Sequence, residues 1–187
     1  MIAYKGFSKD LTARLGKGIF QYEIGKIYTE ETAKCASTGF HCVEEPILVL
    51  HWYGGDEDRY CQVIVDKDVH EDGNDRIAAS RIHIVKELSS VQLATLECDW
   101  IIKHPMRKCS PFVQEKKIAE HGVAIARGKY PIAKGEKGDY LFLLQEDANS
   151  PEIKRFEAYL VDGEQIKADK YINIAGSVVK NAKQRRA

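Results

Sequence analysis

CASTGFHCVEEP, the stretch Cys35–Pro46, decides the first part of the fold, because a strand passes into a helix there. Phe40–Val43 has strand character. Proline suits the first turn of a helix, where its missing N–H is not needed, so we expect a helix to begin at Pro46 and to stop at Gly54-Gly55. We interpret the stretch as a strand-to-helix corner, with His41 lining a groove beside it.

The same stretch raises the question of a metal site, which the spacing does not support. Zinc needs three or four converging Cys, His or carboxylate groups. His41 and Cys42 are neighbours on a predicted strand, so their side chains point to opposite faces. The acidic run Asp66–Asp75 lacks the ligand order of an EF-hand loop, and a solvated turn is the simpler interpretation. We therefore predict no metal.

Around this corner, the first part of the chain reads as short strands. Ile2–Phe7 and Ile19–Ile24 alternate in the period of half-buried strands. Arg59–Val65 and Ile77–Val85 have the same character. Residues 1–88 are therefore predicted to form an N-terminal mixed α/β domain.

Two helical patterns follow and predict a helical connector over residues 89–121. Ser89–His104 is the clearest helix of the chain, because Ser89 and Gln92 can form a capping box ahead of a broad apolar face. Ser110-Pro111 resembles a second cap and first helical position, so a short helix is expected to run through Glu120.

The remaining residues, 122–187, predict a small antiparallel β domain. Val123–Lys129 and Tyr130–Glu136 form two short Ala-Gly repeats that place Ala126 over Ala133, as in stacked turns. Asp162-Gly163 is a hairpin signal between two further strand candidates. The whole chain is thus expected to be an α+β protein.

Composition limits the function. The chain has 187 residues, 28 basic and 28 acidic, with no apolar run of the roughly 20 residues that a membrane helix needs. Its five cysteines show no CxxC spacing, which favours a reduced cytoplasmic setting. Neither a phosphate-cradling glycine loop nor a GxSxG motif occurs. Only the basic tail with Lys183, Arg185 and Arg186 suggests a contact with nucleic acid.

Four runs resemble an uncharacterised domain family of phages and prophages: Tyr4–Phe7, Gly18–Tyr28, Gly39–Pro46 and Arg59–Val63. Members of that family often carry short Ala-Gly repeats and close with a segment similar to Val161–Asp169. The resemblance covers most of the chain. It implies an origin in a mobile element and work in the cytoplasm of a bacterial host, without implying a known reaction.

A more distant resemblance is to ADP-ribosyltransferases. Tyr4-Lys5-Gly6 is similar to their first-strand motif, and Ser37-Thr38-Gly39 or Gly39-Phe40-His41 is similar to a later one, followed by a helix that ends near Tyr53. The resemblance implies that NAD binds in a crevice between the strand of Lys5 and the turn before Pro46.

Carried over residue by residue, this resemblance implies catalytic roles for Lys5, His41 and Ser37. Its binding residues would be Tyr4, Gly39, Phe40 and Tyr53. Lys5 stands where some of these enzymes have arginine, and His41 replaces a tyrosine that stacks on nicotinamide. The required glutamate is not placed, and Glu87, Glu97 and Glu120 are equal candidates.

Three hypotheses for the function follow. The first is a non-catalytic protein that binds and modulates or inhibits a bacterial host protein or protein–nucleic-acid complex, such as a CRISPR-type defence complex. Two acidic patches, Asp56-Glu57-Asp58 and Asp66–Asp75, would imitate phosphates toward a basic groove. The alternative is an NAD-consuming ADP-ribosyltransferase that modifies a host target. An accessory part of the virion is a third hypothesis, suggested by the Ala-Gly repeats alone. The oligomeric state is left open.

Overall fold

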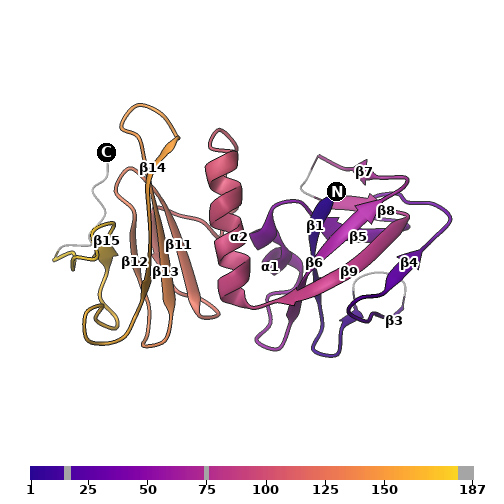
Figure 1. Ribbon diagram of the computed structural model, residues 1–187, viewed down its shortest axis with the longest axis horizontal. Helices are drawn as coiled ribbons and strands as arrows, with labels where there is room; N and C mark the ends of the chain where they lie inside the picture. The colour runs from indigo at the N-terminus through magenta and orange to yellow at the C-terminus, as the bar shows by residue number, and fades with distance from the viewer. Residues whose placement is uncertain (15–17, 74–75, 181–187) are drawn as a thin grey trace. The chain divides into compact units, whose positions relative to one another are not determined.

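The computed structural model describes residues 1–14, 18–73 and 76–180 (Figure 1). The chain divides into two compact units, Met1–Leu93 and Ala94–Ala187. Strands hold 42% of the described residues and helices 12%, so the α+β class predicted from the sequence is wrong and the protein is mainly β. Each unit is built on its own sheets.

The first unit is a seven-stranded sheet in which every neighbouring pair is antiparallel. A short hairpin of β2 (Thr12–Ala13) and β3 (Phe20–Gln21) follows β1 in the chain. From one edge to the other, the strands are β4 (Ile27–Thr29), β9 (Arg81–Leu88), β6 (Arg59–Asp66), β1 (Ile2–Phe7), β5 (Phe40–Val43), β8 (Arg76–Ala79) and β7 (His70–Glu71).

Both faces of this sheet are covered at β1, where five of six residues are buried. Alternation sends Ala3 and Phe7 into one apolar core, together with Phe40 and Val63 from the neighbouring strands. The opposite face carries Tyr4 and lies under the corner that the sequence predicted.

That corner has the expected geometry. Pro46 occupies the start of a 3₁₀ turn, η1 (Pro46–Leu48), which continues into α1 (Val49–Trp52). Tyr53 ends α1, and its ring lies so close to Gly6 of β1 that a Cβ there would come within 2.6 Å of it. Glycine at position 6 therefore lets the helical corner lie directly on the sheet.

The longest helix, α2 (Ser90–Lys103), begins as the sequence predicts. Ser89 N–H donates to Gln92 Oε1 at 2.9 Å and Gln92 N–H donates to Ser89 Oγ at 3.2 Å, which is a reciprocal capping box. The second helix of the predicted connector is absent from the described residues. Ser110 initiates only a tight turn, and β10 (Lys116–Ile118) is extended because it pairs with a later strand.

The second unit contains two three-stranded sheets, and both are mixed rather than antiparallel. In one, β11 (Val123–Gly128) pairs parallel with β13 (Tyr140–Glu146), which pairs antiparallel with β14 (Ile153–Leu160). In the other, β10 pairs parallel with β12 (Ile132–Lys134), and β12 pairs antiparallel with β15 (Ile172–Asn173).

The two Ala-Gly repeats become strands of different sheets instead of stacked turns. Ala124 and Ala126 of the first repeat and Ala133 of the second lie in one apolar core with Leu141 and Leu143. The Asp162-Gly163 turn is followed by bends and turns rather than a strand. Small side chains at these positions allow the two sheets to approach closely within the unit.

Candidate functional site

Lys5 lies inside the first unit with only 8% of its surface exposed. Its ammonium is 5.5 Å from the ring centres of both Phe7 and Tyr22, and it donates a hydrogen bond to the His41 carbonyl at 2.7 Å. Burial lowers the pKa of Lys5 to about 8, although the neighbouring Cys42 opposes this shift. The ammonium thus faces protein groups rather than a substrate.

His41 projects from the other face of the sheet. Tyr4 pairs with Val43, so His41 shares the face of Tyr4, and Lys5 lies on the opposite one. His41 Nε2 accepts a hydrogen bond from the Ala36 N–H at 3.0 Å. Burial, and then the charge of Lys5, lower the pKa of His41, which favours the neutral ring that this contact requires. His41 therefore holds the preceding turn.

The other residues assigned from the enzyme resemblance do not converge with this pair. Ser37 is exposed in the turn before β5. Gly39 has a positive φ of 85°, and its N–H donates to Glu30 Oε2 at 2.8 Å. Phe40 and Tyr4 are buried, with 3% and 8% of their surfaces exposed. The residues proposed for the NAD site therefore lie on the two opposite faces of the sheet and in the turn before β5, and they do not form one site.

Two of the three glutamates considered for catalysis form ion pairs of their own. Glu87 accepts two hydrogen bonds from the Arg59 guanidinium, both at 2.7 Å. Glu120 pairs with Lys117 at 2.9 Å. Glu97 is fully buried on α2. These contacts give Glu87 and Glu120 roles in the fold.

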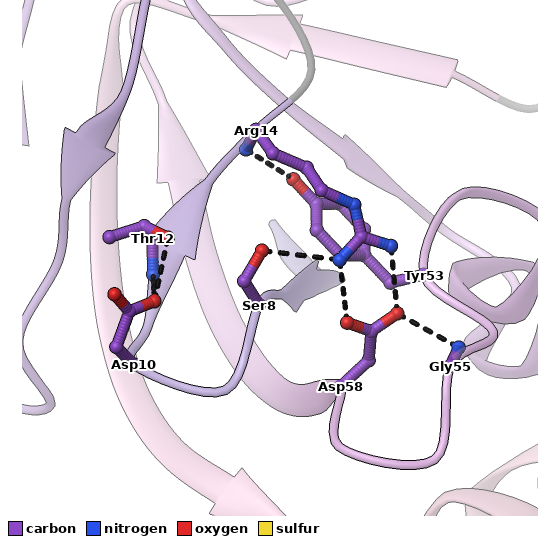
Figure 2. A network of polar contacts seen from close by, with 7 residues as sticks. All are labelled: Ser8, Asp10, Thr12, Arg14, Tyr53, Gly55 and Asp58. Atoms are coloured by element: carbon purple, nitrogen blue, oxygen red, sulfur yellow. Dashed lines mark hydrogen bonds and ion pairs between the residues drawn. The ribbon is translucent and has the colours of Figure 1, made fainter.

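A connected polar network of the first unit surrounds the loop after α1 (Figure 2). Arg14 binds both carboxylate oxygens of Asp58, at 2.6 and 2.9 Å, and also donates to Ser8 Oγ. The Arg14 backbone N–H donates to the Tyr53 hydroxyl at 3.0 Å, and its guanidinium lies 4.5 Å from the centre of that ring. Asp58 also accepts from the Gly55 N–H at 2.9 Å. Arg14 therefore fixes both ends of the loop Tyr53–Asp58.

This loop points its other acidic residues toward solvent. The Asp58 side chain is only 6% exposed, whereas Asp56 and Glu57 are exposed. Glu57 pairs with Lys9 at 2.5 Å, but both side chains are about 70% exposed, and ion pairs of this kind contribute little. Trp52, 36% exposed, lies just before the loop. The result is a loop that is anchored at both ends and has an acidic, partly aromatic surface.

Arg14 was not identified from the sequence. It is separated from Asp58 by 44 positions, and no motif links the two residues. The nearest local signal is Asp10, whose carboxylate accepts from the Thr12 N–H and hydroxyl and so shapes the turn that delivers Arg14 (Figure 2).

The second unit contains a solvent-open cavity of about 360 Å³. Arg127 of β11 lies in its wall with a side chain that is 5% exposed. Its guanidinium donates to Glu146 Oε1 at 2.8 Å, to Cys109 Sγ at 2.8 Å and to the carbonyls of Pro105 and Pro151. Arg127 thus joins the segment after α2 to the β13–β14 hairpin and brings a cation to a half-buried thiol.

The described ranges also bear on metal and membrane sites, and the predicted nucleic-acid contact falls outside them. No group of three or more His, Cys, Asp or Glu residues there could hold a metal ion. No helix there is long and apolar enough to span a membrane. Lys183, Arg185 and Arg186 lie outside the described residues.

A family model described as "Domain of unknown function (DUF7666)" matches residues 1–96, which include the whole seven-stranded sheet and the loop Tyr53–Asp58. No curated protein and no solved structure matches the chain.

Proposed function

The chain belongs to the DUF7666 family of domains of unknown function, and we propose that it binds a basic surface of a bacterial host macromolecule through the loop Tyr53–Asp58. The observation that carries this proposal is the Arg14–Asp58 ion pair, which anchors the loop while Asp56 and Glu57 face solvent. In this proposal, the protein acts without covalent chemistry.

The anchoring of the loop supports a binding role, because a loop held at both ends loses less conformational entropy when a partner docks. The loop has contacts at both ends, from Arg14 to the Tyr53 hydroxyl and to Asp58. Trp52, at the edge of the loop, is a residue type enriched at the energetic centres of protein interfaces.

Charge supports a basic partner. Residues 1–93 contain 15 acidic and 11 basic residues, although the whole chain is balanced. This excess of acidic residues in the first unit attracts a cationic partner and speeds the encounter at low salt. The second acidic stretch is less suited to this role, because Asp66 pairs with Arg81 and Asp72 pairs with Arg76.

The partner class follows from the resemblance to phage and prophage domains. A mobile-element product of this kind would meet host proteins and protein–nucleic-acid complexes in the bacterial cytoplasm. Among these, nucleic-acid-binding complexes such as CRISPR-type defence complexes carry the basic grooves that an acidic loop fits. The expected effect on such a complex is modulation or inhibition by occupying the groove.

ADP-ribosyl transfer is the less well supported alternative. A transferase site would need Lys5 and His41 beside one NAD molecule, but Lys5 is buried against Phe7 and Tyr22 and His41 holds the Ala36 turn from the other face. Incubating the protein with labelled NAD and bacterial lysate tests this alternative. Label transfer that disappears with Lys5→Ala would support it against the binding proposal.

The binding proposal is tested by capture from bacterial lysate with matched charge variants. The variant Asp56→Asn/Glu57→Gln removes two charges from the loop, and Glu23→Gln/Glu31→Gln removes two exposed charges elsewhere in the same unit. We expect a partner that is captured at low salt, is released by added salt and is lost only with the loop variant. Equal capture by both variants would overturn the proposal.

A further inference from the structure

Strand β14 forms one edge of the β11–β13–β14 sheet in the second unit. It has eight residues, and five of them are exposed. Phe156 and Leu160 are 40% and 44% exposed although both are large and apolar. An exposed edge strand of this length is a template for pairing with another strand, and natural proteins usually shorten or cover such edges.

In β14, residues of opposite charge flank Phe156. Arg155 precedes this residue and Glu157 follows it, and the side chains of Arg155 and Glu157 share one face of the strand. They already pair with each other at 3.0 Å while remaining 47% and 37% exposed. A strand with opposite charges at equal distances from its centre is complementary to itself when it is turned around.

We propose that two copies of this chain associate by antiparallel pairing of their β14 strands, with Phe156 opposite the partner's Phe156. In this arrangement, a two-fold axis passes between the two rings. Arg155 of each copy lies opposite the partner's Glu157. The two sheets would join into one six-stranded sheet across the dimer.

Among the registers centred near the middle of β14, the charges favour the one centred on Phe156. Residues that lie opposite each other in a continuous sheet point to the same face. A register that places Arg155 opposite the partner's Phe156 would pair side chains of opposite faces, so it is excluded. A shift that centres the pairing on residue 155 places Arg155 opposite the partner's Arg155, and centring it on residue 157 places two glutamates together. Centring on Phe156 gives two opposite-charge pairs and no like-charge pair.

Ring geometry supports the same centre. The Phe156 ring stacks on Phe142 with their centroids 6.4 Å apart and an angle of 9° between the planes. Phe142 in turn stacks on Tyr140 at 6.5 Å. Pairing at Phe156 would extend this aromatic row across the dimer axis and cover surface that is exposed in one copy. An interface of one strand is small, so we expect a dimer that dissociates on dilution.

Sedimentation analysis of the full chain over a range of concentrations tests the proposal. We expect the apparent mass to rise from 21.2 kDa toward twice that value. Glu157→Arg places arginines opposite arginines and should weaken dimerisation at least about tenfold, and Arg155→Glu should do the same with glutamates. Glu164→Arg, an equal charge change at an exposed residue outside the strand, should leave the dimer intact.

Mixing the two single variants gives the decisive result. Each variant alone has like charges on its strand, but an Arg155→Glu chain facing a Glu157→Arg chain regains two opposite-charge pairs. We expect the mixture to form heterodimers while each variant alone stays monomeric, with circular dichroism confirming that both are folded. A wild type that stays monomeric, or a mixture that does not associate, would overturn the proposal. Failure here leaves the binding loop of the first unit untouched, because the variants lie in different units.

Discussion

The side chains of Lys5 and His41 leave opposite faces of one sheet, although the Lys5 ammonium donates a hydrogen bond to the His41 carbonyl at 2.7 Å. The two residues are thus neighbours through the backbone and not through a shared site. Among the described residues, no carboxylate forms an ion pair with Lys5, and a buried ammonium of this kind is costly while it is charged. Its effect should therefore appear in the stability of the protein.

The first prediction concerns Lys5 and pH. Its folded pKa of about 8 is below the ordinary 10.5, so the unfolded chain binds more protons between these values and stability rises with pH across that window. Lys5→Met removes this dependence. Urea unfolding from about pH 7 to about pH 9 should show the wild type gaining about 1 kcal/mol relative to Lys5→Met. A constant difference between the two proteins would mean that the ammonium is hydrated.

The second prediction separates two ion pairs of the loop Tyr53–Asp58. Asp58→Ala removes the acceptor of the Arg14 guanidinium and of the Gly55 N–H, so we expect a loss of roughly 1.5–3 kcal/mol in the free energy of unfolding. Glu57→Gln breaks only the exposed pair with Lys9 and should cost less than about 1 kcal/mol. Urea unfolding measures both. Similar losses in both variants would contradict the anchoring role of Asp58.

The third prediction concerns the contact between the sheet and the corner after Pro46. Gly6→Ala would place a Cβ within 2.6 Å of the Tyr53 side chain, and overpacking of this kind costs roughly 1–3 kcal/mol. In a Tyr53→Gly background the Tyr53 Cβ and ring atoms, which a Cβ at position 6 would meet at 2.6 to 2.7 Å, are all gone, so the added methyl group should cost less. Thermal and urea unfolding of the four proteins in this cycle measure the difference. Equal costs in both backgrounds would locate the strain elsewhere.

Local patterns in the sequence predicted the elements whose causes are local. Phe40–Val43 and the helix start at Pro46 follow from residues within the corner, and the capping box before α2 follows from Ser89 and Gln92. The family model that matches residues 1–96 carries no function, so the phage and ADP-ribosyltransferase resemblances stay predictions.

Long-range pairing accounts for what local patterns missed. Lys116–Ile118 follows a cap-like Ser110-Pro111 but becomes a strand because β12 is available to pair with it. Parallel pairing of β11 with β13 likewise has no local signature. At the candidate site, the sequence identified Asp58 and Tyr53 but not Arg14, the residue that connects them.

The fourth prediction ranks the cysteines, none of which forms a disulfide. Burial raises the pKa of Cys42 and of Cys61 to about 12 and also raises that of Cys98, so these thiols should react only after unfolding. Cys35 and Cys109 are half-buried and differ in their partners. This leaves two thiols to compare in the folded protein.

The comparison turns on what each sulfur contacts. Cys35 Sγ donates to the His70 carbonyl 3.2 Å away, whereas Cys109 Sγ accepts from the Arg127 guanidinium beside an open cavity, where a reagent can approach and a cation faces the attacking sulfur. With dithiobis(nitrobenzoate) at neutral pH, we expect Cys109 to react at least about tenfold faster than Cys35. Cys109→Ser should remove the fast phase and Cys35→Ser only the slow one. If Cys35→Ser removes the fast phase instead, the guanidinium does not activate Cys109, and Arg127 serves only to join the segments that it binds.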